Sequence, residues 1–305
     1  MPYFKRLLVA VRMNVSTTII YIATGVAFLS IILLFIMLGS LALPLLLQTG
    51  ANSPFTLQWS PANNQFGIVP MLLGSLLLSV LAIIIAVPLA ITISCWLLAI
   101  GRGYKLAVVK NIIYFMTAIP TVVYGFIALF LLTPIIRQLF GGSGLCWLTA
   151  SLMVSILILP TMILVICTGL QTRLNALCPS GLAIGFTKLD LLWTFILPNA
   201  KKTLLAATIL GLGRAIGDTL LPLMLAGNAT QITLHLSDSI RTLSAHMALV
   251  TANEVGGHAY NSLFIAGFLL LVINTLLSLL ARGLTSKNMR QHFLGRSTVI
   301  NDPKI

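Results

Sequence analysis

Two charged residues lie close together inside an apolar stretch of the chain. Arg214 and Asp218 are four residues apart in LGLGRAIGDTLLPLMLAGN, which covers residues 210–228. Because four residues make about one helical turn, the spacing predicts that both side chains leave the same helix face. A charged side chain in hydrocarbon costs roughly 2.5 to 3.5 kcal/mol on insertion scales. The pair is therefore predicted to face the protein interior or a water-filled path.

The elements that hold this pair are predicted to be membrane-spanning helices. Hydrophobic residues make up 58% of the 305 positions and charged residues only 8%, which is too apolar for a soluble globular protein of this length. A spanning helix needs about 20 apolar residues, and the alternating pattern of a membrane β-barrel is absent. The sequence predicts an all-α integral membrane protein.

Six apolar stretches are predicted to span the membrane. They lie at about residues 17–47, 66–100, 112–135, 147–170, 203–226 and 263–280. On this map 15 of the 18 Lys and Arg residues fall in segments on the same side of the membrane, as the positive-inside rule requires of a cytoplasmic side. Both termini are therefore predicted to be cytoplasmic, and the same distribution argues against nucleic acid as a partner.

The predicted organisation has four parts. Residues 1–16 form a cytoplasmic N-terminus, residues 17–66 the first transmembrane helix and an external loop, residues 67–282 the main transmembrane domain, and residues 283–305 a cytoplasmic tail. Within the main domain, the segment 227–260 is too polar to span. Its helical middle, 238–255, has apolar residues at helical spacing, so one face is expected to lie on the outer surface or to dip into the protein.

The cytoplasmic segment at 171–202 is the second informative place. Gly185 can supply a bend between two short helical stretches. Leu189, Leu192 and Trp193 then recur at helical spacing, which predicts an apolar face outside the membrane. A partner protein could bind that face in helix-in-groove mode, or the face could pack against the ends of the protein's own helices.

Motifs of catalysis are missing from the sequence. No GxxxxGK[ST] stretch occurs, so the chain is not expected to bind ATP as a P-loop protein does. The four cysteines stand without a CxxC pair or a cluster of histidines, so no metal site is predicted. We expect a protein that is not itself an enzyme and holds no cofactor.

The cytoplasmic segment resembles the EAA loop of ABC-transporter permeases. That loop has the pattern E-A-A-x-x-x-G, nine residues, then I-x-L-P, and PSGLAIGFTKLDLLWTFILPNAKK at 179–202 matches it at Gly185, Leu197 and Pro198. Pro179 stands where the glutamate is usual, and Phe195 where isoleucine is usual.

Within that superfamily, further stretches are similar to phosphate permeases of the PstC type. They are LQWSPANNQFGIVPMLLGSLL at 57–77, AIPTVVYGFIALF at 118–130, GLGRAIGDT at 211–219 followed by AGN, and TLSAHMALVTANEVGG at 242–257. Asp218 stands where glutamate is usual in these permeases. The resemblance covers roughly residues 55–282.

This resemblance implies a fold, a function and a set of partners. The fold would be that of a type I ABC importer permease, and the protein would carry phosphate by alternating access. It would pair with a second, PstA-like permease subunit, two ATP-binding subunits that hold ATP and Mg, and an extracytoplasmic phosphate-binding protein in the bacterial inner membrane.

Site residues follow from the resemblance and from the residues themselves. Those expected on the substrate path are Arg214, Asp218, Thr121, Tyr124 and Asn228, and those expected to couple to the ATPase are Gly185, Leu189, Leu192, Trp193, Leu197 and Pro198. Three alternatives stay open: an importer of sulfate or molybdate, a secondary transporter or channel, and a purely structural ion pair between Arg214 and Asp218.

Overall fold

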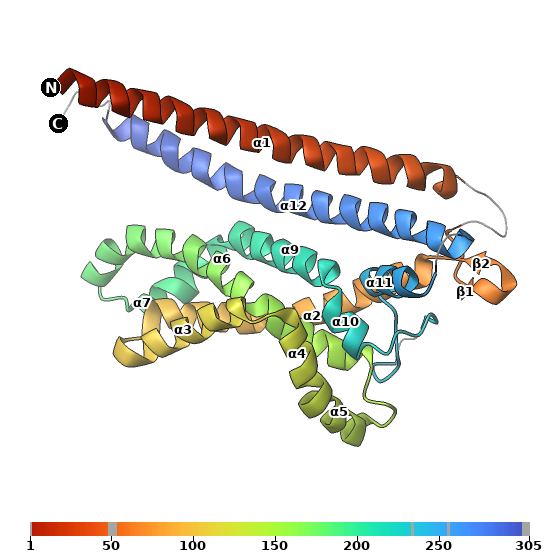
Figure 1. The fold of residues 1–305 in the computed structure, drawn as a ribbon. Helices are drawn as coiled ribbons and strands as arrows, with labels where there is room; N and C mark the ends of the chain where they lie inside the picture. The colour runs from red at the N-terminus through yellow and green to blue at the C-terminus, as the bar shows by residue number, and fades with distance from the viewer. Residues whose placement is uncertain (1, 48–53, 233–234, 255–256, 301–305) are drawn as a thin grey trace.

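The computed structural model describes residues 2–47, 54–232, 235–254 and 257–300, and for residues 2–16, 45 and 284–300 it describes the backbone alone. The chain is almost entirely helical (Figure 1). The α-helices are α1 (Pro2–Leu46), α2 (Val69–Cys95), α3 (Gly103–Ala118), α4 (Thr121–Ile127), α5 (Thr133–Phe140), α6 (Trp147–Ala183), α7 (Lys188–Asp190), α8 (Leu197–Asn199), α9 (Lys201–Gly217), α10 (Leu220–Leu225), α11 (Leu243–Asn253) and α12 (Gly257–Ile300).

Shorter elements complete the fold. Three π-helical segments continue helices without a break: η3 (Trp96–Ile100), η4 (Ala128–Leu132) and η5 (Leu191–Ile196). Before α2, strands β1 (Trp59–Ser60) and β2 (Gln65–Phe66) pair antiparallel around the 3₁₀ turn η2 (Pro61–Asn63). This small hairpin lies within the predicted external loop, of which residues 48–53 are outside the described part.

Five helical stretches in the described part of the chain are long and apolar enough to cross a membrane. They are Thr17–Pro44, Val69–Ile100, Thr121–Phe140, Trp147–Ala183 and Gly257–Gly283. The all-α membrane fold is confirmed. The fifth predicted span, 203–226, is not one helix, because α9 ends at Gly217 and α10 begins at Leu220.

The predicted span at 112–135 is also wrong as a single helix. Helix α3 ends at Ala118, Ile119 is extended (ψ 128°), and α4 begins after Pro120. Proline lacks an N–H and disfavours helical backbone in the residue before it, so Pro120 ends one helix and begins the next. By contrast, Pro88 and Pro160 lie inside α2 and α6, which continue through them.

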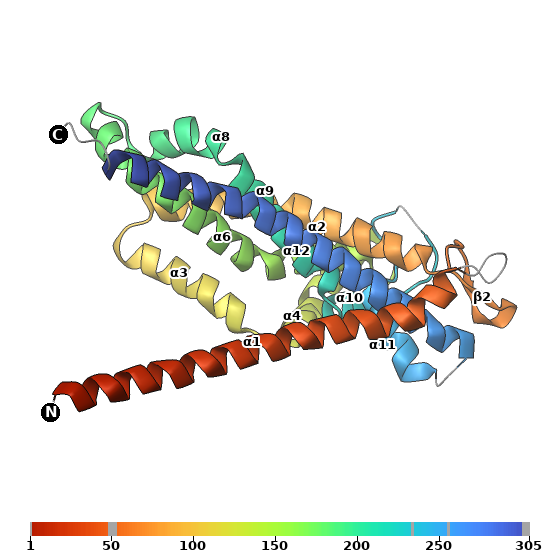
Figure 2. The ribbon, with the colours of Figure 1, turned by 90° about the horizontal axis from the view of Figure 1, so that it is seen from above.

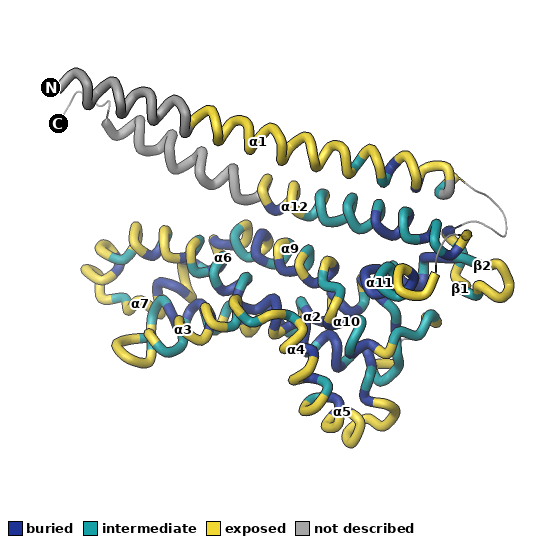
Figure 3. Tube along the Cα trace, viewed as in Figure 1, coloured by how far each residue is buried: buried dark blue, intermediate teal, exposed yellow. Residues whose placement is uncertain are grey.

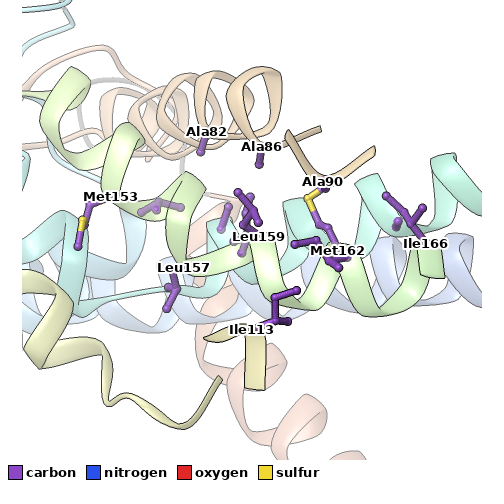
Figure 4. Packing of buried hydrophobic residues seen from close by; sticks show 14 of the residues in the cluster. Ala82, Ala86, Ala90, Ile113, Met153, Leu157, Leu159, Met162 and Ile166 are labelled. Carbon is purple, nitrogen blue, oxygen red and sulfur yellow. The ribbon is translucent and has the colours of Figure 1, made fainter. Parts of the chain in front are cut away.

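A stripe of small residues on α2 forms the centre of the core. Ala82, Ala86 and Ala90 recur every four residues and are completely buried. Figure 4 shows these alanines pointing toward Leu159 and Met162 of α6. Without a hydrophobic effect between helices in lipid, close backbone approach through small residues supplies the packing energy.

Helices α6 and α9 approach each other through glycines. A Cβ atom at Gly211 of α9 would lie 2.9 Å from the sulfur of Met162, and one at Gly169 of α6 would overlap Thr203 of α9. Larger residues at these two positions would force the helices apart. Helices α2, α6 and α9 therefore form a tightly packed unit that positions the end of α9.

The long helices α1 and α12 lie outside this unit. They meet where Ala42 of α1 and Ala266 of α12 share a small second core cluster, and toward the N-terminus α1 diverges from α12 (Figure 2). Most of α1 from residue 17 onward is exposed (Figure 3). Its apolar surface suits lipid or another membrane protein.

The predicted amphipathic segment after α10 folds into the protein. Its helix, α11, runs from Leu243 to Asn253, and Ile240, Leu243 and Val250 are buried, which settles the choice between outer surface and protein interior. His246 is buried too and shares a hydrogen bond of 3.0 Å with Ser262 of α12. Burial, with a smaller contribution from Arg241, lowers the pKa of His246 to about 3, so the ring is neutral at physiological pH.

The alanine stripe gives a stability prediction. Ala86→Leu adds bulk where α2 meets α6, and overpacking of this kind typically costs about 1 to 3 kcal/mol. We expect a lower midpoint of thermal unfolding in detergent. The control is Ile84→Leu, which is isomeric and lies on the exposed side of the same helix. Equal midpoints for both variants would contradict the packing described above.

Candidate functional site

The helix that carries Arg214 stops before it reaches Asp218. Asp218 has extended backbone angles (φ −73°, ψ 131°), and its carboxylate oxygen Oδ2 accepts a hydrogen bond of 3.1 Å from the N–H of Leu221 at the start of α10. Aspartate favours such local side-chain-to-backbone bonds over a helix interior. The prediction that Arg214 and Asp218 share one helix face is therefore wrong.

Arg214 and Asp218 also do not pair directly. The guanidinium of Arg214 donates to the hydroxyl of Thr161 on α6 at 2.9 Å, and its interaction with Asp218 acts through space. Within the described residues no ion pair joins them, so the structural ion-pair alternative has no support. Arg214 is exposed and has five N–H donors, and among the described residues its side chain donates only to Thr161, so most of these donors are available to another partner.

Tyr124 and Thr121 lie on the first turn of α4. The Tyr124 ring is buried, and its hydroxyl donates to the carbonyl of Met116 at 2.8 Å, which bridges the break at Pro120. The charge of Arg214 acts on Tyr124 through space, and α4 packs against α10, which follows the break at Asp218. Thr121 is half-buried beside the break. The structure thus brings part of the predicted path together near two helix interruptions.

Asn228 has a different place in the fold. It adopts left-handed backbone angles (φ 60°), and its side-chain amide donates to the carbonyl of Leu223 at 2.7 Å. The backbone carbonyl of Asn228 accepts a hydrogen bond of 2.9 Å from Nε of Arg241. These contacts make Asn228 a turn residue that ends α10, and none of them reaches Arg214 among the described residues.

Sequence reasoning missed four hydroxyl residues around Asp218. A narrow crevice between α2, α9 and the start of α11 is lined by Asp218 together with Ser75, Ser79, Thr242 and Ser244. Ser75 and Ser79 are four residues apart in a largely apolar helix, which is the same spacing signal that singled out Arg214 and Asp218. Their proximity to residues 242–244 depends on tertiary packing and has no local signal.

Hydrogen bonds tie the start of α11 to both sides of the crevice. The N–H of Leu243 donates to the Ser75 hydroxyl at 2.7 Å, and Ser75 donates in turn to the carbonyl of Met71. The Ser244 hydroxyl donates to the carbonyl of Asp218 at 2.8 Å. Helix α11 therefore holds α2 and the interrupted helix together and keeps the crevice too narrow for a water molecule.

One hydroxyl of the crevice makes no such bond. The Ser79 side chain is 0% exposed, and its Oγ has no hydrogen-bond partner among the described residues. Leaving a buried hydroxyl unsatisfied costs about 1 to 3 kcal/mol. Ser79 thus has unused bonding capacity in the crevice that Asp218 also lines.

The predicted coupling segment follows the end of α6. Gly185 has a positive φ of 92°, a conformation that glycine adopts without the strain that a Cβ atom brings. Two residues later, the Thr187 side chain and the Asp190 carboxylate form a capping box at the start of α7. Hydrogen bonds from the Thr187 hydroxyl and backbone N–H lower the pKa of Asp190, so the box is charged at neutral pH.

The three apolar residues of this segment do not share one surface. Trp193 is 51% exposed and Leu189 is 36% exposed, but Leu192 is 0% exposed and belongs to the main core. The prediction that Leu192 lies on an open docking face is therefore wrong. Its side chain packs against the protein's own helices. Of the other predicted coupling residues, Gly185 and Pro198 are exposed and Leu197 is half-buried.

Comparison with known proteins identifies the family. A family model described as "Binding-protein-dependent transport system inner membrane component" matches residues 96–290, which include the interrupted helix and the coupling segment. The chain belongs to this family. It is therefore a permease subunit of an ABC transporter in the inner membrane, and the alternative of a secondary transporter or channel is excluded.

Individual relatives point in the same direction. The permease is 30% identical to a probable ABC transporter permease, YqgH of Bacillus subtilis, over 236 residues and 76% of each chain. It is 28% identical to the phosphate transport system permease protein PstC of Mesorhizobium japonicum over 299 residues, 89% of this chain and 91% of that one. For PstC of Xylella fastidiosa strain Temecula1 the identity is 26% over 256 residues, 76% and 78% of the two chains.

The Ser79 hydroxyl, which lacks a hydrogen-bond partner among the described residues, gives a stability prediction that can be tested without substrate. Ser79→Ala removes the buried hydroxyl without changing the shape of the core, so we expect the midpoint of thermal unfolding of the permease to rise, by the equivalent of about 1 kcal/mol. The matched control is Ser155→Ala on α6, whose buried hydroxyl already donates to Leu152 and whose loss is not expected to stabilise. A Ser79→Ala variant that unfolds at a lower temperature than the native permease would show that the hydroxyl is satisfied.

Proposed function

We propose that this permease carries phosphate across the inner membrane in an ATP-driven importer. The observation that carries the proposal is the exposed guanidinium of Arg214, positioned by Thr161 beside a helix interruption in the membrane domain. Arginine binds tetrahedral oxyanions through charge-assisted, bidentate hydrogen bonds. The similarity to PstC proteins, whose names give phosphate as the substrate, supports the same choice.

The proposed complex contains three kinds of partner besides lipid. A second, PstA-like permease subunit would complete the path, an extracytoplasmic phosphate-binding protein would deliver the substrate, and two ATP-binding subunits would hold ATP and Mg. This chain would hold no cofactor of its own. The positive-inside pattern supports cytoplasmic termini and a cytoplasmic coupling segment at 171–198.

Helix α9 provides the mechanical link in this proposal. The coupling segment ends in α8, and α9 begins at Lys201 and runs without interruption to Gly217. Arg214 is 13 residues along that helix, about 20 Å at 1.5 Å per residue. A displacement of the coupling segment by the ATPases would therefore move Arg214 with it, while the break at Asp218 lets α10 respond separately. Substrate would then be exposed alternately to the two sides.

Removing the positive charge that is proposed to bind phosphate tests the function. Arg214→Ala should reduce ATP-dependent uptake of labelled phosphate into vesicles by about tenfold or more at low substrate, because a charge-assisted hydrogen bond contributes about 1.5 to 3 kcal/mol. Arg214→Lys should retain part of the activity. The control Arg137→Ala removes an exposed cation at the end of α5 and should leave uptake unchanged. Full uptake by Arg214→Ala would contradict substrate binding by this residue.

The coupling proposal predicts different effects for substitutions at two adjacent residues, Trp193 and Leu192. Trp193→Ala should weaken co-purification of the ATP-binding subunits while leaving thermal stability within about 0.5 kcal/mol, because its side chain is exposed. Leu192→Ala should instead destabilise the permease by about 2 to 5 kcal/mol, because its side chain is buried in the core. Unchanged ATPase association in Trp193→Ala would show that the partner binds elsewhere.

A further inference from the structure

The crevice lined by Asp218 contains one acceptor with bonding capacity left over and one donor that has no partner among the described residues. What they would bind rests on the proposed function. The carboxylate of Asp218 accepts from Leu221 through Oδ2. An ionised carboxylate has about four lone-pair sites, so most of its capacity remains. Within the described part of the chain no lysine or arginine forms an ion pair with it.

Ser79 is the matching donor. Its hydroxyl lines the same crevice, is completely buried, and has no partner among the described residues. The neighbouring hydroxyls differ in this respect: Ser75 bonds Met71 and Leu243, and Ser244 bonds the carbonyl of Asp218. Ser79 is therefore the hydroxyl of the crevice that is free to serve a ligand.

The ligand must suit both groups at once. A hydroxyl donor requires an acceptor oxygen on the ligand, whereas an ionised carboxylate requires a donor, because two facing oxygens with only lone pairs repel. A phosphate group has an ionisation near neutral pH, so inorganic phosphate carries at least one proton there, and arsenate is chemically alike. Sulfate carries none at neutral pH and has nothing to donate to Asp218.

We propose that Asp218 and Ser79 form a subsite that accepts a protonated tetrahedral oxyanion and rejects a fully ionised one. Arg214 supplies the positive charge that both kinds of anion require, and Asp218 distinguishes them by accepting the hydrogen bond that only the protonated anion donates. The crevice is closed by the bonds from Leu243 and Ser244 to its two sides. Movement of α11 away from α2 would open the subsite as part of the transport cycle.

The test measures binding to the purified permease–ATPase complex in lipid nanodiscs without the binding protein, so that delivery does not impose its own selectivity. Labelled phosphate is competed with arsenate and with sulfate at neutral pH, and labelled sulfate is also bound directly. We expect arsenate to compete and sulfate to fail in the native complex. Asp218→Asn keeps an oxygen for Leu221 but adds N–H donors, so we expect it to bind sulfate at least tenfold better than the native complex.

Three further variants complete the design. Ser79→Ala should weaken phosphate binding severalfold while thermal stability rises, whereas Ser155→Ala, whose hydroxyl is satisfied within α6, should change neither. Asp218→Glu keeps a carboxylate, so it should reject sulfate as the native complex does and as Asp218→Asn does not. If Asp218→Asn still rejects sulfate, or if the native complex binds sulfate as well as arsenate, the subsite proposal is wrong while phosphate transport stands. If the native complex neither binds phosphate in nanodiscs nor takes it up into vesicles, the proposed function is wrong, and the subsite proposal is wrong with it.

Discussion

The interruption of the fifth predicted span at Asp218 is the constraint on which the rest of the site depends. A carboxylate that caps α10 through Leu221 cannot also continue α9. The break separates Asp218 from Arg214, exposes the guanidinium, and leaves a backbone carbonyl for Ser244 to bind. Irregular backbone within a membrane domain needs partners of this kind, because lipid offers none.

The surrounding helices make this interruption tolerable. Alanines on α2 and glycines on α6 and α9 bring three helices close together, so Ala215 and Ile216 just before the break are buried and Asp218 is half-buried. The same closeness makes α9 a stiff element from Lys201 to Gly217. A rigid helix that ends at a break in the helical backbone can transmit a displacement from one end and still let the segment beyond it move independently.

Helix α11 has a role that its position in the chain does not suggest. It follows a polar segment between two predicted spans, yet its first turn contacts α2 and the break at Asp218, and His246 anchors it to α12. Each of these polar anchors is a single hydrogen bond, and such bonds contribute about 1 kcal/mol each. The helix is also held by apolar packing, because Leu243 is completely buried in the second core cluster.

The sequence by itself determined that the protein is an α-helical membrane protein and that Arg214, Asp218 and the segment around Gly185 are unusual. Hydrophobicity and the cost of charge in lipid are properties of residues, so they are visible without coordinates. The sequence could not show that the helix stops before Asp218, since the spacing of four also fits one continuous turn.

Only the tertiary structure decided which groups meet. Leu192 and Trp193 are adjacent in sequence but one is core and the other exposed, because η5 packs only one of its sides against α6. Ser75 and Ser79 face Asp218 for the same reason: a crevice exists only where α2, α9 and α11 pack together. Long-range packing has no local pattern in the chain.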